Sequence, residues 1–68
     1  MNNHYEVVVG NIGTVYAGSS LDAALKMFRE YKDQSLSGVG RAGREDVTVL
    51  KNGDVRWEFN GQRGKVVR

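Results

Sequence analysis

The sequence predicts an α+β fold of ββαββ order: a four-stranded, mostly antiparallel sheet with one helix packed on one face. Two β-rich hairpin patterns and one helical pattern between them support this fold class. Each hairpin offers an apolar face and the helix offers an apolar stripe, so a helix laid across the sheet buries all three. We expect a single domain over residues 1–68. Its last segment, 60–68, is a basic tail that is either flexible or returns as an edge strand at 65–67.

The first hairpin is expected from residues 5–9 and 14–17, which are rich in β-branched and aromatic side chains. A three-residue loop with Gly13 in the left-handed conformation would place Val9 opposite Val15, and Val7 opposite Ala17. In this register, the side chains expected on the core face are Tyr5, Val7, Val9, Val15 and Ala17. Those expected on the opposite, open face are Glu6, Val8, Thr14 and Tyr16.

A helix is expected between the hairpins, capped by Ser19 or Ser20. Ser19 and Asp22 have the spacing of a capping box, with Asp in place of the preferred Glu. The residues that follow the helical period are Leu21, Ala24, Leu25, Phe28 and Tyr31. The segment 35–38 ends the helix.

The second hairpin is expected from residues 46–50 and 55–59, joined across Asn52-Gly53. A two-residue type I′ turn at Asn52-Gly53 would set Thr48 opposite Trp57 and turn the valines toward charged neighbours. A three-residue loop instead pairs Val47 with Trp57. Because a slip of one residue moves every side chain to the other face, the hydrophobic pattern favours the three-residue loop.

Composition limits the chemistry. The 68 residues include no cysteine and a single histidine, so a disulfide, a thiolate metal site and a histidine cluster within one chain are excluded. His4 is expected as an exposed strand residue and the serines as helix caps, so no catalytic residue, metal or cofactor is expected. A chain this small without staples gains stability by association, which favours a homodimer. With no apolar run long enough for a membrane and no secretory signal, we expect a cytoplasmic protein.

The open face of the sheet is the first candidate site, because it is more apolar than a solvated face requires. Tyr16 is the only aromatic residue and Arg56 the only basic residue expected there, which favours a protein partner over nucleic acid. The protein-binding residues expected on this face are Val8, Tyr16, Leu50 and Arg56.

The glycine- and arginine-rich segment 37–44 is the second candidate. Its G-x-G-x-x-G spacing follows a helix and leads into a strand, which is the wrong context for dinucleotide binding. It is either a connector or an anion-binding loop. Residues 1–34 carry three basic and four acidic side chains, a net charge of −1, whereas 35–68 carry seven and four, a net charge of +3. The residues that would bind a phosphate are Gly38, Gly40, Arg41, Gly43, Arg44, Arg63, Lys65 and Arg68.

The stretches YEVVVGNIGTVYAG, FREYKDQS and SGVGRAGREDVTVLKNGD resemble small proteins encoded by bacteriophages, over most of residues 5–54. The resemblance carries no functional residue. It implies a protein made in an infected bacterial cell that binds a host enzyme, a defence component or a signalling nucleotide. We therefore expect a non-catalytic, homodimeric binding protein that acts on a bacterial host factor as an inhibitor or anti-defence protein. The alternative is a nucleic-acid or nucleotide-phosphate binding protein.

Overall fold

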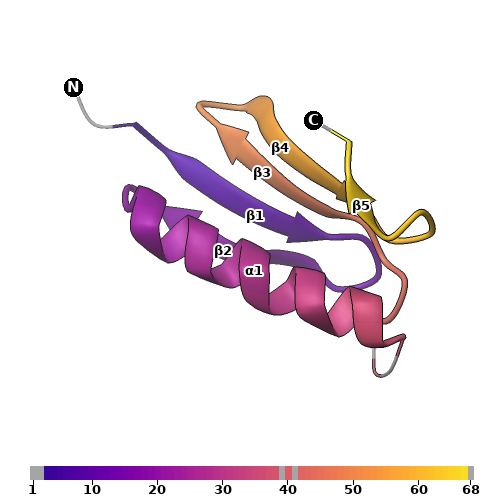
Figure 1. Cartoon of the computed structure of the whole chain (residues 1–68). Coiled ribbons are helices and arrows are strands. Elements are labelled where there is room, and N and C mark those ends of the chain that lie inside the picture. Colours follow the sequence, from indigo (N-terminus) through magenta and orange to yellow (C-terminus); the bar gives the residue numbers. More distant parts are fainter. Residues whose placement is uncertain (1–2, 39, 41, 68) are drawn as a thin grey trace.

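The computed structural model describes residues 3–38, 40 and 42–67. Its elements in chain order are β1 (Tyr5–Val9), β2 (Gly13–Gly18), α1 (Leu21–Ser37), β3 (Val47–Lys51), β4 (Asp54–Asn60) and β5 (Lys65–Val66). The strands form one antiparallel sheet in the order β2-β1-β3-β4-β5, and α1 lies across one face of it (Figure 1). The predicted α+β class is confirmed, with five strands in place of four. The fifth strand is the edge strand considered for the tail, with Val66 opposite Phe59.

The core lies between α1 and the strands β1, β2 and β3, on which the helix packs. Two cross-strand pairs form its floor, because Val7 lies opposite Val49 and Val9 lies opposite Val47. All four valines are fully buried. Phe28 of α1 and Phe59 of β4 complete the packing, and each such buried side chain stabilises the fold by about 1.5–3 kcal/mol. The prediction that the valines face the helix, with Val8 and Leu50 on the other side, is therefore confirmed.

The predicted register of the first hairpin is wrong. Val7 lies opposite Tyr16 and Val8 opposite Thr14, so a β-bulge leaves Val15 without a partner in β1. The bulge shifts the alternation by one residue, so that Tyr16 packs against the core while Ala17 is exposed opposite Glu6. Burying a phenol ring removes far more apolar surface from water than burying an alanine methyl group. The Tyr16 hydroxyl also accepts a hydrogen bond from the Ser20 backbone N–H at 3.1 Å.

The second hairpin also differs from its prediction. Asn52 and Gly53 form a two-residue loop between the paired Lys51 and Asp54, and both loop residues have positive φ, 52° and 87°, as a type I′ turn requires. A β-bulge at Arg56 then advances β4 by one residue, which places Trp57 opposite Val49 on the core side. The bulge allows the favoured turn and the apolar pattern to coexist.

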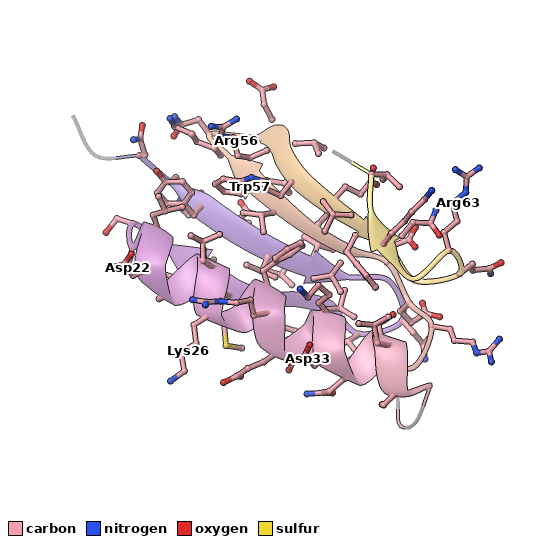
Figure 2. All side chains as sticks on the ribbon, viewed as in Figure 1. Asp22, Lys26, Asp33, Arg56, Trp57 and Arg63 are labelled. Atoms are coloured by element: carbon pink, nitrogen blue, oxygen red, sulfur yellow. The ribbon has the colours of Figure 1, made fainter. Side chains whose placement is uncertain are left out.

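The helix begins at the second of the two serines. The Ser20 Oγ accepts a hydrogen bond from the Ala23 N–H at 3.1 Å, so the capping box predicted from Ser19 and Asp22 is not formed. Gly38 ends the helix in the left-handed conformation (φ 70°). The charged residues labelled on α1 in Figure 2, Asp22, Lys26 and Asp33, project away from the sheet.

Candidate binding surfaces

The open face of the sheet carries a diagonal apolar band. Leu50 lies directly opposite Val55, and Val8 is one diagonal step away across the β1–β3 ladder. Val8 and Leu50 are half-buried, whereas Val55 keeps 39% of its surface exposed. Two carboxylates flank the band, because Glu6 lies opposite Leu50 and Glu58 lies opposite Thr48. The structure thus leaves an apolar surface with a charged margin on the side that α1 does not cover.

Two residues predicted for this face make contacts that the sequence did not indicate. Tyr16 packs on the helix side, as described above, and contributes nothing to the open face. The Arg56 guanidinium lies 4.9 Å from the centre of the Trp57 ring, and the two side chains lie side by side in Figure 2. Arg56 is therefore engaged in a cation–π contact with a half-buried core residue. Of the four residues predicted for protein binding, Val8 and Leu50 form part of the apolar band, Tyr16 lies on the helix side, and Arg56 contacts Trp57.

His4 lies beside the first strand, with its Nε2 3.1 Å from the Glu6 Oε1, and both side chains are solvent-accessible. Among the residues that the structure describes, no group of three or more histidine and carboxylate side chains is placed to hold a metal ion.

A second surface lies at one end of the sheet, where the segment between α1 and β3 meets the turn between β4 and β5. An open cleft of about 590 Å³ forms there, and a smaller hollow of about 240 Å³ adjoins it. Arg44, Gln62 and Arg63 line both. The remaining residues of the larger cleft are Gly10, Glu45, Asp46 and Asn60.

Ser35 fixes the first wall of this cleft. It is 1% exposed, and its Oγ donates a hydrogen bond to the Glu45 carbonyl oxygen at 2.7 Å. Its own carbonyl oxygen accepts from the N–H groups of Gly38 and Arg44, at 3.1 and 3.0 Å. One buried serine thus joins the end of α1 to the chain that enters β3. Ala42 is fully buried beneath this segment, so the described part of the connector is packed and hydrogen-bonded.

The second wall is the turn after β4. The Asn60 Oδ1 accepts hydrogen bonds from the N–H groups of Gln62 and Arg63, at 3.0 and 2.9 Å. The N–H of the buried Gly61 donates to the Asp46 Oδ1 at 2.8 Å. A Cβ atom at Gly61 would lie 2.4 Å from the backbone of Arg44 and Glu45, so only glycine allows the two walls to approach this closely.

The predicted phosphate-binding residues do not form one cluster. Gly38 serves as the helix cap, Gly40 and Gly43 are joined by a backbone hydrogen bond of 3.1 Å, and Lys65 lies exposed in β5. Arg44 and Arg63 both line the cleft. The remaining predictions, Arg41 and Arg68, lie outside the described residues.

Sequence reasoning missed Ser35 and Gly61, which build this cleft. Ser35 stands at a helix end, where serine is common, and Gly61 follows Asn60 in an ordinary turn pair. Neither pattern indicates a contact with a segment 10 or 15 residues away in the chain.

Comparisons with protein-family models, with curated proteins and with solved structures find no match to this chain. Within the residues that the structure describes, no helix has the length and apolar character that a bilayer crossing requires.

Proposed function

We propose that this chain is a non-catalytic binding protein that docks through the open face of its sheet. The observation that carries the proposal is the apolar band of Val8, Leu50 and Val55, which no other element of the described chain covers. An apolar patch with a charged margin is typical of a protein contact surface.

The small size of the chain supports association through this face. A 68-residue chain without disulfides buries only a limited share of its surface when it folds alone. Here α1 covers one side of the sheet, so a partner on the other side would add a second apolar layer. We propose a second copy of the chain as the first such partner.

The resemblance to bacteriophage proteins makes a bacterial host protein the proposed target of this module, in the cytoplasm of an infected cell. Inhibition of a host or defence factor requires only a complementary surface and no catalytic group. This role needs no general base, and the His4 side chain is 55% exposed beside Glu6.

The test is a Leu50→Lys variant, which places a charge in the centre of the band. We expect the native chain to sediment as a dimer in analytical ultracentrifugation, and the variant to sediment as a monomer. Affinity capture from bacterial lysate followed by mass spectrometry should yield a host protein with the native chain and lose it with the variant.

Leu36→Lys is the matched control, because Leu36 is 55% exposed but belongs to α1 on the other side of the sheet. It should leave both the sedimentation and the captured protein unchanged. A native chain that is monomeric, and that captures the same proteins as the Leu50→Lys variant, would refute the proposal.

A further inference from the structure

The cleft at the end of the sheet is a separate surface from the open face. We propose that it binds the phosphate group of a nucleotide or nucleic acid, with Arg44 and Arg63 supplying the positive charge.

The two arginines are available for such a ligand. Among the described residues, neither guanidinium group has an ion pair, hydrogen bond or ring contact. Arg63 extends from the turn between β4 and β5 away from the sheet (Figure 2). Guanidinium groups match phosphate oxygens with two parallel hydrogen bonds, and these charge-assisted bonds are stronger than neutral ones.

The two acidic residues of the cleft, Glu45 and Asp46, are not paired with these arginines. An Asp46 carboxylate oxygen accepts the Gly61 N–H, and the Glu45 side chain lies against Gly10, where its Oε1 would be 2.6 Å from an added Cβ. Within the described residues, neither carboxylate comes within 4.0 Å of an arginine nitrogen.

The backbone of Arg44 gives an independent reason to assign its side chain a role. Its φ of 61° lies in the left-handed region, where residues other than glycine and asparagine are uncommon. A glycine would adopt this conformation without the steric cost of a Cβ atom. The presence of arginine at this position favours a ligand-binding role for its side chain, since strained residues are concentrated at ligand sites.

The walls of the cleft are already fixed without a ligand. The buried Ser35 holds the Arg44 segment, and Asn60 holds the Arg63 turn through two backbone N–H groups. The volume of about 590 Å³ is within the range of small-molecule sites, about 300–1,000 Å³. The cleft is therefore large enough for a phosphate together with its nucleoside.

The test is a titration of the ¹⁵N-labelled full chain, followed by NMR, with pyrophosphate, ATP and a short single-stranded oligonucleotide. We expect chemical-shift changes at the backbone amides of residues 44–46 and 61–63. Arg44→Gly and Arg63→Gln should each weaken binding by about ten- to a hundredfold, which is the loss of one charge-assisted contact. Arg29→Gln removes an exposed charge from α1 and should change nothing.

The Arg44→Gly variant should melt at the same temperature as the native chain or higher, so that its loss of binding is separable from unfolding. If the Arg44→Gly variant unfolds, the binding affinity of the Arg63→Gln variant tests the proposal instead. Equal responses to pyrophosphate and ATP indicate a nucleotide phosphate. Tighter oligonucleotide binding that falls steeply between 50 and 200 mM salt indicates a nucleic-acid backbone.

Four results would overturn the proposal. The first two are the absence of chemical-shift changes with millimolar pyrophosphate, and chemical-shift changes with ATP but not with pyrophosphate. The other two are a native binding affinity in the Arg63→Gln variant, and a loss of affinity in Arg29→Gln equal to that in the arginine variants of the cleft. Because none of these variants touches Val8, Leu50 or Val55, the result is independent of docking through the open face.

Discussion

Replacing Gly61 with alanine should destabilise the fold strongly, because Gly61 lies directly against the backbone of Arg44 and Glu45. The added Cβ would lie 2.4 Å from the Arg44 carbonyl carbon and oxygen and from the Glu45 carbonyl oxygen. All three atoms belong to the backbone, so no side-chain rotation can relieve the overlap. The two walls of the cleft would have to separate by about 1 Å to restore ordinary van der Waals contact.

That separation would break the hydrogen bond from the Gly61 N–H to Asp46 and stretch the bond from Ser35 to the Glu45 carbonyl oxygen. Two hydrogen bonds at about 1 kcal/mol each, together with the cost of overpacking, give a loss of about 2–4 kcal/mol. For a domain of this size the melting temperature should fall by about 10–30 °C.

The assay is thermal and urea unfolding followed by the fluorescence of Trp57, which is half-buried against the core. Gly10→Ala is the matched control. Its Cβ would also meet Glu45, at 2.6 Å, but the atom it meets is the Oε1 at the end of a rotatable side chain. The control should stay within about 0.5 kcal/mol of the native chain. Equal stability of the two variants would refute the close backbone approach at Gly61.

Two further substitutions test the polar contacts of α1. Ser35→Ala removes the buried hydroxyl that donates to the Glu45 carbonyl oxygen and should cost about 1–3 kcal/mol in urea unfolding; native stability would contradict a structural role for this bond. Ser20→Ala removes the helix cap and should cost about 1 kcal/mol by thermal unfolding followed by circular dichroism, while Ser19→Ala should be nearly neutral. The reverse order would show that the helix begins one residue earlier.

Local patterns predicted the elements well because they depend on short-range spacing. The helix, its end within 35–38 and the positive φ of Gly13 follow from residues a few positions apart. The predicted registers of both hairpins were wrong for the same reason. Each second strand carries a β-bulge, at Val15 and at Arg56, and a bulge changes the facing of every residue beyond it.

The second hairpin illustrates the difficulty. In a ladder without a bulge, the type I′ turn and the apolar pattern of β4 are incompatible, because the turn would place Thr48 opposite Trp57. The bulge at Arg56 satisfies both, because it adds one residue between the turn and Trp57. The guanidinium group of Arg56 also stacks on the Trp57 ring. Nothing within the hairpin sequence specifies where the extra residue is inserted, since the position of the bulge depends on which side chains pack on the face that α1 covers.

By itself the sequence determined the α+β class, the helix, and the valines that form the core floor, because these depend on periodicity and local backbone preference. Tertiary packing alone decided the position of Tyr16, the fifth strand and the cleft between Arg44 and Arg63. The cleft in particular requires segments distant in the chain to touch, as Gly61 touches the backbone of Arg44. The fit between two such surfaces depends on three-dimensional shape, which no spacing along the chain encodes.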